Sequence, residues 1–125
     1  MGEILLRRIY EEKKEKETRI LVDRLWPRGV SKEKADLDHW AKDITPSDAL
    51  RQAYHDGKLE KEQFQEHYRK EMAENEAMET FLTYVEDRLK EQDVVLLSSV
   101  KELSDSHVPV LKEFLEEKRM KKNGR

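Results

Sequence analysis

The sequence contains no cysteine. Disulfide bonds, thiolate nucleophiles and cysteine-ligated zinc or iron–sulfur clusters are therefore excluded within this chain. Glycine and proline are also scarce, and no linker rich in either divides the 125 residues, so we expect one domain.

No apolar run approaches the ~20 residues of a membrane span, and the opening MGEILLRRIY lacks the apolar core of a secretory signal. We expect a cytoplasmic protein with no membrane association.

Glycine motifs that cradle phosphate are missing, since neither GxGxxG nor GxxxxGK occurs. Nothing therefore supports a P-loop or a dinucleotide-binding fingerprint. His39, His55 and His67 are widely spaced, and no histidine pair has the spacing of two ligands on one helix face. We predict no metal site and no cofactor.

Charge is abundant but uneven. Charged residues make up 42% of the chain, and the net charge is -3. Residues 118–125 hold five Lys or Arg and no acid, which leaves residues 1–117 at -8. We expect a domain over residues 1–117 and a basic C-terminal tail over residues 118–125. Such a tail is either a solvated chain end or a contact for nucleic acid.

Three short apolar segments are typical of β-strands: Ile4–Tyr10, Arg19–Leu25 and Val94–Val100. The continuous VVLL of the third indicates a central strand that is covered on both faces. Between the first two segments, the charged interval EEKKEKE holds only seven residues, which is too short for a crossover between neighbouring parallel strands. These two strands therefore form a hairpin or lie apart in a parallel sheet.

Four helical patterns occupy most of the remainder. The first opens at TPSD, where we expect Thr45 to cap and Pro46 to take the first helical position, and Gly57 is suited to end it. The other three have apolar stripes at helical spacing. Strands followed by amphipathic helices indicate an α/β protein: a single small layered domain with a mostly parallel or mixed short sheet flanked by about four helices. The stripes are Phe64, Tyr68 and Met72; Met78, Phe81, Leu82, Val85 and Leu89; and Val108, Leu111, Phe114 and Leu115.

Polar side chains cluster where two of the predicted strands end. In open α/β sheets, ligands bind beyond the carboxyl ends of the strands. Guanidinium groups, an ammonium group and a helix N-terminus there favour an anion, and arginine matches the oxygens of phosphate or carboxylate. The sequence therefore predicts a site for a small anionic ligand. Its expected binding residues are Asp23, Arg24, Trp26, Arg28, Ser98 and Lys101, with His107 as the expected catalytic residue.

These residues also have structural interpretations. Arg24 can pair with a carboxylate, Trp26 can close one end of the core, and the PRG sequence can be a turn. His107 can transfer a proton, or it can cap and pack at a helix start. Ser98 and Ser99 lack the GxSxG context of an activated nucleophile.

The sequence is compatible with three functions. One is a hydrolase or transferase in which Arg24, Arg28 and Lys101 share a cleft and hold the anion while His107 moves a proton. The alternative is a non-catalytic module that binds a small anion or nucleic acid. The third is an interaction protein, for which residues such as Met72, Met78 and Phe81 would be partly exposed. Oligomeric state and substrate stay open.

The motifs VDRLWPRG and WAKDITPS, followed by VVLLSSVKELSDSHVPVLKEFL, resemble the YeaO-like branch of the domain of unknown function 488 family. The resemblance implies a small α/β domain and carries no established activity. It also implies parallel first and second strands, because longer members place a helix between them. Longer relatives have cysteine at the positions of Ser98 and Ser106, so the resemblance supports no thiol mechanism here. The family pattern falls on Asp23, Arg24, Trp26, Pro27, Arg28, Gly29, Trp40, Pro46, Ser47, Lys101 and His107.

Overall fold

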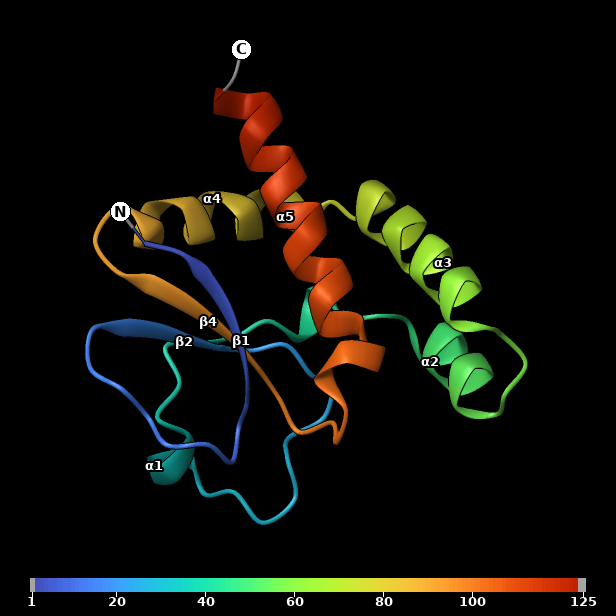
Figure 1. Cartoon of the computed structure of the whole chain (residues 1–125), viewed down its shortest axis with the longest axis horizontal. Helices are drawn as coiled ribbons and strands as arrows, with labels where there is room; N and C mark the ends of the chain where they lie inside the picture. The colour runs from blue at the N-terminus through green and yellow to red at the C-terminus, as the bar shows by residue number, and fades with distance from the viewer. Residues whose placement is uncertain (1, 124–125) are drawn as a thin grey trace.

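A parallel sheet in the strand order β1-β4-β2-β3 organises the chain (Figure 1). The computed structural model describes residues 2–123, the last three by their backbone only. The predicted central strand is confirmed, because β4 lies between β1 and β2 and pairs with both in parallel. The first two strands therefore form no hairpin and lie apart. The strands are β1 (Ile4–Arg8), β2 (Glu17–Leu21), β3 (His39–Trp40) and β4 (Asp93–Ser98).

Four helices of at least two turns accompany the sheet within residues 2–123, together with a single-turn α1 that the sequence patterns did not predict. Figure 1 shows α1 set apart from the others, beside the long loops that follow β1 and β2. The α/β class and the small single domain are confirmed. The helices are α1 (Lys32–Ala35), α2 (Asp48–His55), α3 (Lys61–Glu74), α4 (Ala77–Leu89) and α5 (His107–Asn123), with 3₁₀ turns η1 (Lys42–Ile44) and η2 (Leu103–Asp105).

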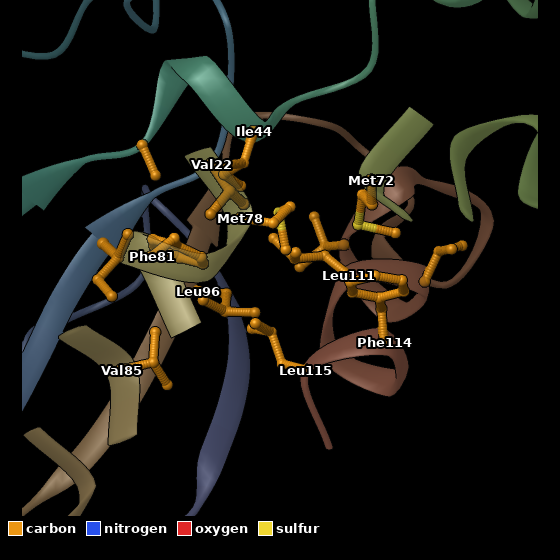
Figure 2. Close-up of a cluster of buried hydrophobic side chains, with 14 of the residues drawn as sticks. Val22, Ile44, Met72, Met78, Phe81, Val85, Leu96, Leu111, Phe114 and Leu115 are labelled. Carbon is orange, nitrogen blue, oxygen red and sulfur yellow. The ribbon is translucent and has the colours of Figure 1, made fainter. Parts of the chain in front are cut away.

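The main core lies between the sheet and the helices α2 to α5 (Figure 2). The stripes predicted for α3, α4 and α5 provide most of it. Met72, Met78 and Phe81 are only 1%, 6% and 5% exposed. An interaction surface built on these three side chains is therefore ruled out, because they are core residues.

The opposite face of the sheet carries a smaller apolar cluster and a buried ionic bridge. Arg7 Nη1 on β1 donates to Glu17 Oε1 on β2 over 2.7 Å, so the bridge spans the intervening β4. Arg19 Nη1 lies 3.8 Å from the same oxygen, and Arg19 Nε donates to the Ala35 carbonyl in α1. Burial alone would raise the pKa of Glu17, but the hydrogen bond from Arg7 and the other positive neighbours outweigh it and lower the pKa.

Three predicted boundaries differ from the structure near the site, and one of them is the end of the third predicted strand, which lies at Ser98 instead of Val100. The second strand ends at Leu21 instead of Leu25, because the chain turns there to aim Asp23 at the loop after β4. The helix α2 begins at Asp48, and its cap is Ser47, whose Oγ accepts from the Leu50 N–H. Thr45 is not the cap, since its hydroxyl donates to the Lys42 carbonyl.

The basic C-terminal segment continues α5 as far as Asn123. Its first residues are therefore helical, whereas residues 124–125 of the predicted tail lie outside the described part of the chain.

At the C-terminal end of α2, Gly57 has φ of +77°, a left-handed conformation that glycine adopts without strain. Gly57 thus ends this helix segment as the sequence predicts.

Candidate functional site

A cavity of about 480 Å³ lies beyond the carboxyl ends of β2 and β4. Because these strands are parallel neighbours, the loops that follow them lie side by side and form two of its walls. The third wall comes from the segment before α2 and from the helices α2 and α3. Its volume is within the range of roughly 300–1,000 Å³ that is usual for small-molecule sites.

Asp23 joins the first two walls. Its Oδ1 accepts from Ser98 Oγ over 2.7 Å, and its Oδ2 accepts from the Ser99 N–H and Oγ over 2.8 and 2.9 Å. The Asp23 carbonyl also accepts from the indole N–H of Trp40. A buried carboxylate requires such partners, and here they come from the neighbouring loop. Asp23 therefore fixes the two loops to each other.

His107, the first residue of α5, lies against the same network. Its Nε2 is 2.5 Å from the Val22 carbonyl and 3.7 Å from Asp23 Oδ1. Since a carbonyl only accepts, Nε2 carries the proton. Burial lowers the pKa of His107 below its ordinary 6.5, against the opposing effects of the Val22 carbonyl and Asp23. The imidazole is therefore neutral at pH 7, and its Nδ1 is an acceptor with no hydrogen-bond partner among residues 2–120.

Three arginine side chains surround the cavity, and two of them share one carboxylate. Asp48 Oδ1 lies 3.5 Å from Arg24 Nε and 3.3 Å from Arg51 Nη2. Arg24 also donates to the carbonyls of Thr45 and Pro46, which holds the loop after β2 against the start of α2. Asp48 is therefore shared by two guanidinium groups that both line the cavity.

Arg28, the third arginine, is exposed and lies in the turn that Gly29 makes with φ of +77°. Glycine is favoured there because residues with a side chain are strained in this conformation. Trp26 lines the cavity as well, but its indole N–H donates to the Val30 carbonyl, and its ring packs edge-on against Trp40. The ring of Trp26 is thus positioned by the turn, and its polar atom is unavailable to a ligand.

Aromatic side chains also form part of the helical wall. Tyr54 and Phe64 both line the cavity, and their rings stack with centroids 4.2 Å apart and planes 11° from parallel. The hydroxyl of Tyr54 donates to the Asp105 carbonyl in η2, which connects α2 to the loop before α5. Aromatic surface is therefore present on both sides of the cavity, from Trp26 and from this pair.

The structure brings most of the expected site residues together. Asp23, Arg24, Trp26, Arg28 and His107 all line the cavity. Ser98 is fully buried and does not line the cavity. Its hydroxyl donates to Asp23 and accepts from the Val100 N–H. The neighbouring Ser99 lines the cavity instead. Lys101 is exposed and does not line the cavity.

Sequence reasoning missed the helical wall, including Arg51, Tyr54 and Phe64. Arg51 and Tyr54 are three residues apart on α2 and therefore lie on one helix face. This spacing is visible in the sequence, but only the fold shows that the face borders the strand ends.

No group of three or more His, Asp or Glu side chains in residues 2–123 is arranged to hold a metal ion. Within the same residues, no helix is both long enough and apolar enough to cross a membrane.

The sequence profile of one family, DUF488-N3i, described as the inactive DUF488-N3 subclade, matches residues 3–125. The chain belongs to this family. It is 40% identical over 113 residues to the uncharacterized protein YeaO of Escherichia coli, covering 90% of this chain and 96% of the relative. The uncharacterized protein Rv3073c of Mycobacterium tuberculosis is 31% identical over 98 residues, covering 78% and 79%. No solved structure matches the chain significantly.

Proposed function

We propose that this protein is a binding module that holds a small organic anion, bearing phosphate or carboxylate, at the ends of β2 and β4 without transforming it. One observation carries the proposal: Arg24 and Arg51 converge on Asp48 Oδ1 while both line the cavity. Each of these two guanidinium groups keeps N–H donors that match the oxygens of an anion. Arg28 adds a third positive side chain at the rim.

Three acidic side chains also line the cavity and offset the charge of the three arginines, but two of these acids already have hydrogen-bond or ion-pair partners. Asp23 is occupied by hydrogen bonds from Ser98 and Ser99, and Asp105 pairs with Lys61 Nζ over 3.1 Å. Glu102 is the exposed acid of the lining that lacks a described partner. An anion that enters therefore meets arginine donors while most opposing carboxylates are already engaged.

Binding without chemistry is favoured over catalysis by the same network. An activated serine donates its proton toward a histidine, which accepts it. Here both Ser98 and Ser99 donate to Asp23, and His107 Nε2 donates to a backbone carbonyl. Among the side chains that the structure describes, no hydroxyl is paired with His107, so these groups do not generate a nucleophile. The description of the family as inactive supports this choice.

The test is isothermal titration of the full chain with small phosphates and carboxylates, each paired with a neutral analogue of the same shape. The proposal expects that at least one anion binds while its neutral analogue does not. Replacing Arg51 by Gln is expected to weaken that binding about tenfold, since a charge-assisted hydrogen bond contributes roughly 1.5 kcal/mol.

A matched control is Lys14→Gln, an exposed cation in the loop between β1 and β2 that does not line the cavity. It removes the same charge and is expected to leave the affinity unchanged. Equal binding of charged and neutral analogues would refute anion recognition. Conversion of any bound compound into a product that depends on His107 would refute the non-catalytic function.

A further inference from the structure

Arginine and aromatic side chains occur as neighbours on both sides of the cavity. On α2, Arg51 and Tyr54 are separated by three residues, so their Cβ atoms lie roughly 5–6 Å apart on one face. On the opposite side, Arg24 and Trp26 are two residues apart in the loop after β2. Each wall therefore carries both a cation and an aromatic ring.

The aromatic rings are held in place before any ligand binds. Tyr54 is fixed at one end by its hydroxyl bond to the Asp105 carbonyl and along its ring by stacking on Phe64. Trp26 is fixed by its bond to the Val30 carbonyl and by edge-on contact with Trp40. Rings immobilised in this way lose little further conformational entropy when a ligand packs against them. Their hydrogen-bonding atoms are already used, so they offer a ligand mainly their apolar surfaces.

We infer that the ligand of this cavity joins a flat conjugated ring to its anionic group, the ring packing on the Tyr54 and Trp26 walls while Arg24 and Arg51 bind the anion. This inference rests on the proposed anion-binding function and adds that the ligand also contains a flat ring. Aromatic pairs contribute about 0.5–1.5 kcal/mol beyond their buried area, so the ring strengthens binding measurably. A nucleoside monophosphate and an aromatic carboxylic acid both have this chemistry, and they differ in the spacing between ring and charge.

The experiment titrates the wild-type chain with two ring-bearing anions and with the separate halves of each. Adenosine 5′-monophosphate is compared with adenosine and with ribose 5-phosphate, and indole-3-acetate is compared with indole and with acetate. The expected result is that one of the two parent compounds binds at least about tenfold more tightly than either of its halves. The parent that does so identifies the source of the ring.

The outcomes separate the two proposals. If ribose 5-phosphate and acetate bind as tightly as their parents, the ring is irrelevant and this inference fails, while anion binding stands. If adenosine and indole bind as tightly as their charged parents, the anion is irrelevant and the proposed function fails. If no compound binds more tightly than about 1 mM, both fail.

Tyr54→Leu provides a second test, since it keeps apolar volume and removes the ring. It is expected to abolish the advantage of the parent compound over its charged half. Tyr84→Leu is the matched control, because Tyr84 also lies on a helix beside another ring, that of His39, but does not line the cavity. An unchanged advantage in Tyr54→Leu would overturn the inference, and the wild-type comparison of parents and halves decides it independently of how this variant folds.

Discussion

Asp23 Oδ2 accepts two hydrogen bonds from Ser99, one from the backbone N–H at 2.8 Å and one from the hydroxyl at 2.9 Å. Asp23 follows β2, and Ser99 follows β4. The contact therefore joins the chain segments that leave two neighbouring strands, and these segments are walls of the cavity. The shape of the site depends on one buried carboxylate that a ligand does not need to contact.

Replacing Asp23 by Asn is expected to lower the free energy of unfolding by about 2 kcal/mol, because an amide presents a donor where the carboxylate accepts, and a buried donor then loses its partner. Urea denaturation measures this change. Asp43→Asn, at an exposed position, is the control. A loss below about 0.5 kcal/mol in Asp23→Asn, the range of ordinary surface changes, would contradict the structural role assigned to this carboxylate.

His107 is expected to make the protein less stable as the pH falls below neutrality. Its pKa is lowered in the folded state, so below about pH 6.5 the unfolded chain binds a proton that the folded chain does not. Stability is therefore complete above that pH and decreases below it, until the folded state is protonated too. Urea denaturation between pH 7.5 and pH 5 is expected to show a shallower decrease for His107→Gln, whose amide can still donate to the Val22 carbonyl. An identical slope would show that His107 is not the group responsible.

Glu17→Gln is expected to destabilise the fold by about 3 kcal/mol, because it leaves two buried guanidinium groups, Arg7 and Arg19, without their shared counter-charge. Thermal and urea unfolding provide the measurement, and Glu15→Gln, at an exposed position in the same loop, serves as the control. Equal stability of the two variants would mean that the bridge across β4 contributes nothing net.

Two cations that the sequence groups together are expected to behave differently. Arg28 lines the cavity, whereas Lys101 is exposed outside it. For an anion that binds the wild-type chain, titration is expected to give a several-fold weaker affinity for Arg28→Gln and nearly the wild-type affinity for Lys101→Gln. The reverse order would place the anion at the loop after β4 instead.

Much of the fold is predictable because burial leaves a simple pattern. The run VVLL indicates a strand covered on both faces, and β4 is indeed central, with Val94 to Leu97 fully buried. The apolar residues that recur at helical spacing in α3 and α4 correctly predict which face of each helix is buried. The cap of α2 is predicted two residues too early, at Thr45 instead of Ser47. The sequence does not show that Glu71 on α3 accepts hydrogen bonds from Ser47, or that Arg24 donates to the carbonyls of the two residues before Ser47.

The site is predictable only on its strand side. Parallel strand ends bring Asp23, Arg24 and His107 together by a general rule of α/β sheets. The helical wall with Arg51 and Tyr54 depends on how α2 packs after a loop, which residue spacing does not encode. The choice of Ser99 over Ser98 at the cavity likewise depends on the alternation of side chains at the end of β4.

The most direct test of ligand binding without chemistry is one-dimensional ¹H NMR of adenosine 5′-monophosphate and of indole-3-acetate, each incubated with the full chain at pH 7 for a day. The account predicts that resonances of at least one compound broaden or shift as protein is added, and that no new resonance appears in either sample. New product resonances that grow with protein concentration, or spectra of both compounds that the protein leaves unchanged, would contradict it.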